Sequence, residues 1–150
     1  MMSNSGGYVR AICSSAARGI PKKDRGEGRL VQDHGLEGDA HAARNSGRQV
    51  SILLEQYVKP VSRQLGYEPA PGSFAENILI GGLPDDNLGR GTVLKVGEAV
   101  VEITAIGKED TVEHTYSFEG YSLLAEKGLF GRVLESGSAR IGDAVVVLKK

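Results

Sequence analysis

Apolar residues recur along this chain in short runs separated by glycine and proline, and these runs predict β-strands. Strands are expected at residues 7–13, 77–80, 92–96, 100–106, 129–134 and 144–148. Gly97-Glu98 has the chemistry of a tight hairpin turn between two of them. Because isolated hairpins of this length bury too little surface, closure into a barrel is the expected arrangement.

One segment, residues 52–65, has the spacing of an amphipathic helix. Its apolar positions recur at intervals of three and four, namely Leu54, Tyr57, Val58, Val61 and Leu65. Ser51 is a candidate N-cap, and Gly66 is suited to end the helix. Pro60 removes one hydrogen bond, which predicts a bent helix or two short ones. One or two further helical turns are expected at residues 121–127.

Length and composition indicate a single globular domain. The chain has 150 residues, of which 40% are apolar and 25% charged. A net charge of −1 gives no basic footprint for nucleic acid. No apolar run approaches the roughly 20 residues that a membrane span needs, and residues 1–7 lack the features of a signal peptide. We therefore expect a cytoplasmic protein without nucleic-acid or membrane partners; its one cysteine, Cys13, excludes an internal disulfide.

The stretch 33–51 carries the densest polar chemistry of the chain. It contains two histidines, three carboxylates and two arginines: His34, His41, Asp33, Glu37, Asp39, Arg44 and Arg48. Apolar residues recur there at neither the helical nor the strand period, so a loop is predicted, and loops on a rigid scaffold often carry function. The spacing of its histidines matches no zinc template, so we expect no metal bound by protein ligands alone.

Anion binding is the chemistry that this stretch fits best. The guanidinium groups of Arg44 and Arg48 offer a bidentate fork to phosphate or carboxylate. The alternative is structural, with Asp39 and Arg48 pairing to hold the loop. The basic stretch 14–29 also allows two interpretations. It is either a mobile loop or a loop that faces an anion.

Five ordered segments of the chain share a pattern with one known family. They are Gly19-Ile20-Pro21-Lys22, Gly35–His41 followed by Arg48-Gln49-Val50-Ser51, Phe74-Ala75-Glu76-Asn77, Gly107-Lys108-Glu109, and Gly128–Leu134 followed by Gly137 and Gly142-Asp143. This set resembles the MOSC domain, the module at the C-terminus of molybdenum cofactor sulfurases. The resemblance covers about residues 8–148, so the chain looks like a small stand-alone member with one MOSC-like domain over residues 1–150.

The resemblance implies a mainly β, closed barrel-like fold with one or two helices and a pocket. In the family that pocket is associated with molybdenum cofactor or with the transfer of sulfur to a metal centre. The pyridoxal phosphate of full-length sulfurases belongs to a separate domain. Segments that match the family provide the candidate cofactor-binding residues His41, Arg48, Asn77, Lys108 and Arg132. Residues 33–48 are expected to line the pocket, with the side chains of His41 and Arg48 pointing into it.

One position departs from the family pattern. Gly-Lys-Glu is typically followed by a cysteine that carries sulfur or ligates molybdenum, whereas here Asp110 follows. A thiolate can hold transferable sulfur and a carboxylate cannot, so sulfur transfer is not expected at this position. Three functions stay open. They are binding of molybdenum cofactor or a related anion, a non-catalytic binding or assembly module for a partner protein in cofactor metabolism, and an enzyme in which Asp110, Glu113 or His114 acts as general base.

Overall fold

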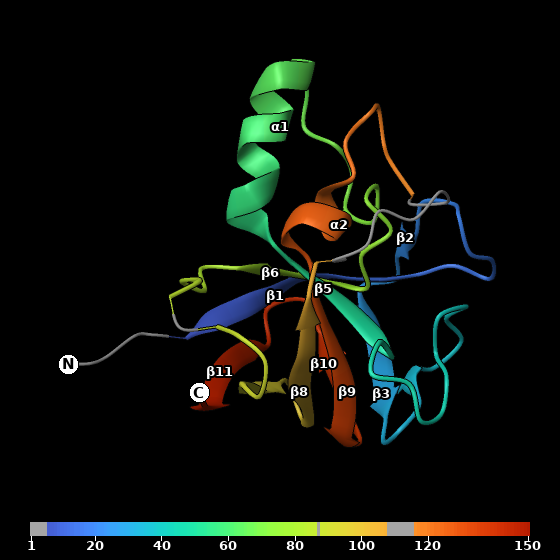
Figure 1. Cartoon of the computed structure of the whole chain (residues 1–150), viewed down its shortest axis with the longest axis vertical. Helices are drawn as coiled ribbons and strands as arrows, with labels where there is room; N and C mark the ends of the chain where they lie inside the picture. The colour runs from blue at the N-terminus through green and yellow to red at the C-terminus, as the bar shows by residue number, and fades with distance from the viewer. Residues whose placement is uncertain (1–5, 87, 108–115) are drawn as a thin grey trace.

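Seven strands form a closed ring in the computed structural model, which describes residues 6–86, 88–107 and 116–150 (Figure 1). They are β1 (Gly7–Ser14), β5 (Val50–Leu54), β6 (Ile78–Gly81), β7 (Val93–Val96), β8 (Ala99–Ile106), β9 (Leu129–Glu135) and β11 (Ala144–Lys149). Their order is β11-β7-β8-β9-β5-β6-β1, and pairing of β1 with β11 closes the ring. Only the β5–β6 pair among these is parallel. The prediction of a mainly β barrel is thereby confirmed.

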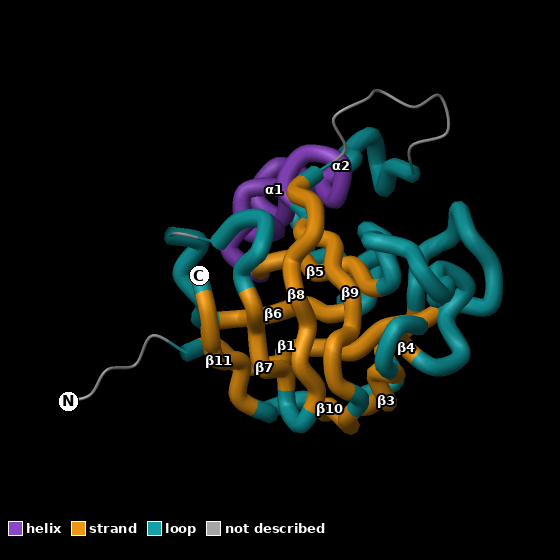
Figure 2. Tube along the Cα trace, turned by 60° about the horizontal axis from the view of Figure 1, so that its bottom comes forward, coloured by secondary structure: helices purple, strands orange, loops and turns teal. Residues whose placement is uncertain are grey.

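Four short strands that the sequence did not predict complete the sheet structure. β2 (Lys23–Asp24) extends the pairing of β1, while β3 (Glu27–Val31), β4 (Gly35–Leu36) and β10 (Gly137–Arg140) form a separate three-stranded sheet. This small sheet lies at the end of the barrel opposite the helices (Figure 2). Leu30, Leu36 and Ala139 of this sheet join the core inside the barrel, so it covers that end.

A second apolar cluster lies outside the barrel, beneath the helices α1 (Val58–Leu65) and α2 (Leu123–Lys127). Strand β5 contributes to both clusters, because Ile52 faces the barrel interior and Leu53 faces the helices. Both helices lie at the same end of the barrel (Figure 1). Among the described residues, no helix combines the length and apolarity needed to cross a membrane.

The helix expected over residues 52–65 begins later than predicted. Residues 50–54 form the fully buried strand β5, and the 3₁₀ turn η1 (Glu55–Tyr57) leads into α1. Ser51 is therefore a strand residue and not an N-cap. Pro60 lies in the first turn of α1, where a backbone N–H has no helical partner to lose. Gly66 ends the helix in the left-handed conformation, with φ of 80°, as expected.

Candidate functional site

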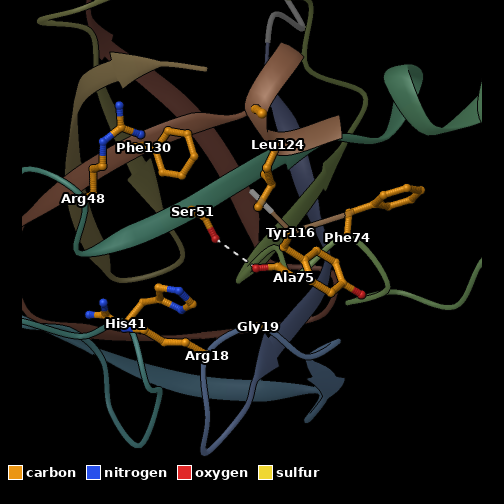
Figure 3. A pocket seen from close by; sticks show the side chains of 11 residues that line it. Arg18, Gly19, His41, Arg48, Ser51, Phe74, Ala75, Tyr116, Leu124 and Phe130 are labelled. Carbon is orange, nitrogen blue, oxygen red and sulfur yellow. Dashed lines mark hydrogen bonds between the residues drawn. The ribbon is translucent and has the colours of Figure 1, made fainter. Parts of the chain in front are cut away.

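A cavity of about 440 Å³ lies between the polar loop (residues 37–49, from β4 to β5), strand β5 and helix α2. Several segments that are far apart in the chain provide its walls (Figure 3). The lining residues are Arg18, Gly19, His41, Arg48, Ser51, Phe74, Ala75, Tyr116, Leu124, Ala125 and Phe130. This volume falls within the range of small-molecule binding sites.

The cavity combines apolar walls with cationic and polar side chains. Phe74, Leu124 and Phe130 supply large apolar surfaces, and Arg18 and Arg48 are the charged residues of the lining that the structure describes. In Figure 3, Arg48 lies beside the Phe130 ring, while Arg18 and His41 lie on the opposite side of the cavity. Cations next to aromatic and aliphatic surface favour a ligand that carries both an anionic group and a flat apolar part.

Arg48 is exposed but held in place by two contacts. Its Nη2 donates a hydrogen bond to the carbonyl oxygen of Gly107 over 3.2 Å. Its guanidinium carbon lies 4.3 Å from the centre of the Phe130 ring, which is a cation–π contact. These contacts restrict the side chain before any ligand arrives, so less conformational entropy is lost on binding.

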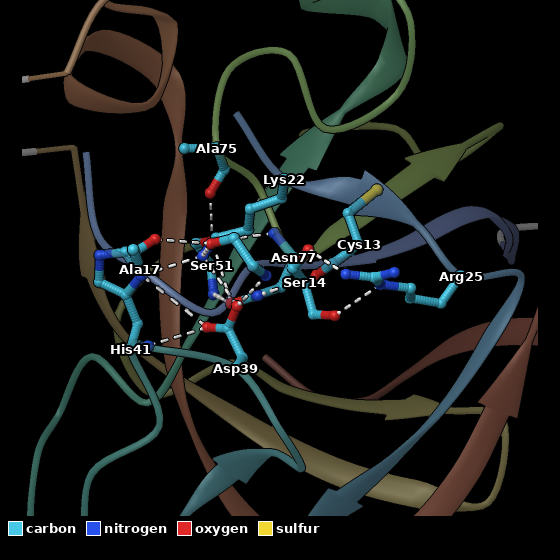
Figure 4. A network of polar contacts seen from close by, with 11 residues as sticks. Cys13, Ser14, Ala17, Lys22, Arg25, Asp39, His41, Ser51, Ala75 and Asn77 are labelled. Carbon is cyan, nitrogen blue, oxygen red and sulfur yellow. Dashed lines mark hydrogen bonds and ion pairs between the residues drawn. The ribbon is translucent and has the colours of Figure 1, made fainter. Parts of the chain in front are cut away.

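A buried polar network stands behind His41 (Figure 4). The Lys22 ammonium lies 2.8 Å from Asp39 Oδ1, 3.0 Å from Ser15 Oγ and 3.0 Å from His41 Nδ1. The exposed fraction of the side chain is 1% for Lys22 and 0% for Asp39. The network therefore anchors the imidazole ring from the protein interior.

Asp39 is the acceptor that organises this network. Besides Lys22, it accepts hydrogen bonds from the backbone N–H groups of Ser15, at 3.1 Å, and His41, at 3.0 Å. Burial alone raises the pKa of Asp39, but the hydrogen bonds from Lys22 and the two backbone groups outweigh it, and the pKa lies below its ordinary value. Asp39 is thus paired with Lys22 and not with Arg48, the partner that the structural alternative proposed.

Close backbone contact fixes Lys22 in this position. The Lys22 N–H donates to the Gly72 carbonyl oxygen over 2.8 Å. A Cβ atom on Gly72 would come within 2.0 Å of the Lys22 carbonyl oxygen, and Gly72 has φ of +91°. Only glycine tolerates both the positive φ and the close approach of the Lys22 carbonyl oxygen. Gly72 therefore allows the 70–74 turn to hold the segment that carries Lys22.

Glu76 and Asn77 stabilise the neighbouring turn and strands. Glu76 is 1% exposed, and its carboxylate accepts the N–H groups of Gly72 and Phe74 at 2.8 and 3.1 Å. Asn77 accepts from the Ser51 N–H at 3.0 Å and donates to the Cys13 carbonyl oxygen at 3.1 Å.

The structure places two of the predicted binding residues away from the cavity lining. Asn77 is 0% exposed, and its side chain connects β1 with β5 within the barrel wall. Arg132 lies 3.1 Å from Asp33, a carboxylate that also accepts from Gln49 Nε2 at 2.8 Å. Both side chains have structural partners, and the cavity lining, which includes neither residue, gives no support to their predicted roles in binding.

Of the predicted site residues, the structure brings His41 and Arg48 together at the cavity. Lys108, Asp110 and His114 lie outside the described residues, so their predicted roles stay predictions. Among the described residues, no group of three or more histidine, cysteine, aspartate or glutamate side chains could hold a metal ion.

Lys22 belongs to the basic stretch for which the sequence predicts either a mobile loop or a loop facing an anion, and neither interpretation predicts its burial. It is 4% exposed and joined to the cavity through His41. The one available signal was its place in Gly19-Ile20-Pro21-Lys22, which matches the family pattern. Its partner Asp39 is 17 residues away, so no local pattern indicates the pair.

Cys13 is expected to be unreactive in the folded protein. The thiol is 0% exposed, and burial, followed by the charges of Glu76 and Asp24, raises its pKa. Iodoacetamide at pH 8 should leave the native protein unmodified and alkylate it fully in concentrated guanidinium chloride, as measured by intact mass. Rapid alkylation of the native protein would show that the thiol reaches solvent.

Comparison with known proteins agrees with this fold. The YuaD protein from Bacillus subtilis has a similar structure, with TM-score 0.69 and 16% identity over 93% of this chain and 94% of that one. YiiM from Escherichia coli has TM-score 0.63 and 19% identity, covering 95% of this chain and 70% of that chain. YiiM from Geobacillus stearothermophilus has TM-score 0.63 and 16% identity, covering 95% of this chain and 73% of that chain.

At these identities the likeness to solved structures shows the fold alone, and no curated protein matches the sequence. The sequence model of the MOSC domain, however, matches residues 37–146, which is most of the chain. That match includes the polar loop, strand β5 and helix α2, the elements around the cavity. The chain therefore belongs to the MOSC-domain family.

Proposed function

We propose that the cavity binds molybdenum cofactor or a closely related anionic pterin phosphate. The observation that carries the proposal is Arg48, which is stacked on Phe130 and held by Gly107 at the cavity. A fixed guanidinium suits a phosphate, and the adjacent ring surfaces suit a flat heterocycle. Arg18 adds a second positive charge to the lining.

The residues present fit such a group. Phosphate oxygens require donors, which Arg18, Arg48 and His41 can provide, and a pterin ring requires apolar contact, which Phe130 and Leu124 can provide. When bound, the cofactor would supply metal-centred redox chemistry. The protein's part is to bind the phosphate, orient the ring and exclude water from the apolar side of the cavity.

Sulfur carriage by a cysteine of this chain is not part of the proposal. The residue after Gly107-Lys108-Glu109 is Asp110, and a carboxylate holds no transferable sulfur. Cys13, the only thiol of the sequence, is buried in the apolar cluster beneath the helices. Any activity at this site would therefore depend on a bound group and not on a protein persulfide.

The test is thermal unfolding of the purified protein with a pterin monophosphate, with the unphosphorylated pterin and inorganic phosphate as comparisons. A ligand that binds only the native state must raise the Tm with its concentration. We expect the pterin monophosphate to raise Tm at lower concentration than either fragment. The absence of any shift with all three compounds would contradict a pterin phosphate site.

Arg48→Met should weaken binding of the pterin monophosphate about 10- to 150-fold, because a charge-assisted hydrogen bond contributes about 1.5–3 kcal/mol. Arg132→Met is the matched control, since it removes an arginine that is paired with Asp33 and is not among the residues that line the cavity. The control should change Kd by less than about twofold. Calorimetric titration of both variants measures this, and equal losses would exclude a specific role of Arg48.

A further inference from the structure

The Lys22 ammonium uses its three donors on three acceptors. Asp39 Oδ1 is a carboxylate oxygen and can only accept. Ser15 Oγ donates its own proton to the Ala17 carbonyl oxygen over 2.9 Å, so it accepts from Lys22. The third neighbour of the ammonium is His41 Nδ1, at 3.0 Å. An ammonium has no lone pair to offer, so this ring nitrogen must accept as well.

The shared proton between Lys22 and His41 belongs to Lys22. An alkyl amine is a stronger base than imidazole by several orders of magnitude. The carboxylate of Asp39 lies 2.8 Å from the ammonium and 3.8 Å from His41 Nδ1, so it stabilises the positive charge on the lysine more strongly. The Nδ1 atom therefore carries no proton, and a neutral ring must carry its proton on Nε2.

From this geometry we infer that Lys22 is a positioning residue that fixes His41 as the Nε2–H tautomer, a hydrogen-bond donor at the cavity. The Nδ1 edge is anchored in the protein, whereas 39% of the His41 side chain is exposed. The ring cannot then serve as a general base or ligate a metal through either nitrogen. Resting on the proposed function, the inference adds that an acceptor oxygen of the ligand faces His41.

The surroundings of His41 also favour its role as a hydrogen-bond donor. Its own backbone N–H donates to Asp39 Oδ2 over 3.0 Å, which couples the ring's position to the buried carboxylate. The other charged or titratable groups that line the cavity in the described structure are Arg18, Arg48 and Tyr116. Two of these are cations that can only donate, and the Nε2–H of a neutral His41 ring adds a further donor. The site thus presents donors to an electron-rich ligand.

The decisive measurement is the nitrogen NMR spectrum of the ring in protein labelled with ¹⁵N-histidine, at pH 7 and without ligand. We expect a protonated Nε2 and an unprotonated Nδ1 for His41, whose signals are identified by their loss in His41→Gln. A protonated Nδ1 in the wild-type protein would overturn the inference. This measurement needs no variant at Lys22 and no ligand.

Lys22→Met gives the directional test. Without the ammonium, the Asp39 carboxylate still lies 3.8 Å from Nδ1, which favours a proton on Nδ1. The spectrum of His41 should therefore change to the Nδ1–H or the doubly protonated form, while that of His34 stays unchanged. Ser15→Ala is the matched control, because it removes another partner of Lys22 and should leave the His41 tautomer in place. An unchanged tautomer in folded Lys22→Met would refute the role of Lys22.

Addition of the pterin monophosphate separates this inference from the proposed function. If both hold, the His41 Nε2 signal moves on saturation and Nδ1 remains unprotonated. Binding that leaves the Nε2 signal in place would overturn the donor role of His41. If the tautomer is as expected but no binding occurs, the proposed function fails and the statement about the ligand oxygen fails with it.

Discussion

Asp39→Ala is expected to lower the free energy of unfolding by about 3–5 kcal/mol, because it leaves a buried ammonium without its counter-charge. The Lys22 side chain is 1% exposed, and its remaining hydrogen-bond partners among the described residues would be the neutral acceptors Ser15 and His41. The backbone N–H groups of Ser15 and His41 would lose their acceptor as well. Urea denaturation at pH 7 measures the loss.

The matched control for Asp39→Ala is the double variant Lys22→Met and Asp39→Leu. Replacing both members of a buried ion pair with apolar residues of similar size is often neutral, so this variant should recover most of the lost stability. A loss below about 1 kcal/mol in Asp39→Ala would mean that water reaches the ammonium readily. Equal instability of the single and double variants would mean that the shape of the pair matters more than its charge.

Between about pH 4.5 and pH 8, Glu76 should reduce the free energy of unfolding by about 3 kcal/mol as the pH rises. Burial raises the pKa of Glu76 from an ordinary 4.5 to about 7, against the opposing hydrogen bonds from Gly72, its own backbone and Phe74. The folded state holds the proton in this window and the unfolded state releases it. Stability from this group is therefore fully present below pH 4.5 and is lost as the pH rises through 7.

Glu76→Gln isolates this contribution, because the amide does not titrate and nearly preserves the shape. Urea denaturation of both proteins at pH 4.5 and pH 8 should show that the stability difference between them changes by about 3 kcal/mol. Carboxylates whose pKa is lowered by folding, such as Asp39, are present in both proteins. Their contributions to the pH dependence of stability therefore cancel in this comparison. Parallel pH profiles would show that Glu76 titrates alike in the folded and unfolded states.

The strands of the barrel were predictable wherever apolar residues alternate between turn signals. Strands β8 and β9 are examples, and their observed bounds differ from the predicted ones by one residue. Residues 52–54 of strand β5 were mistaken for the start of a helix because both faces of the strand are buried, one inside the barrel and the other under α1. A continuous apolar run carries no period, so the sequence cannot separate the two forms. Strand β4 has two residues, too few for any pattern.

The candidate site was predictable only in part, and the reason is the distance along the chain between its members. His41 and Arg48 lie in one polar stretch that family resemblance singled out. The network behind them joins Ser15, Lys22 and Asp39, and its geometry depends on the approach of Gly72. Each of these residues has an ordinary local role, so only the folded chain shows that they meet.

Pairing of β1 with β11 determines when this barrel can be completed. Gly7 is the partner of Val145, and Tyr8 is the partner of Ala144, so the last junction of the ring joins residues separated by nearly the whole described chain. Such junctions require the closure of very long loops, which makes the folding of β-rich proteins slow compared with helical bundles. On the ribosome, β2 can pair with Cys13 and Ser14 early, but the Gly7–Tyr8 part of the same edge of β1 has no partner until β11 has been synthesised. Until then that open edge is a place where a nascent chain can associate wrongly with another.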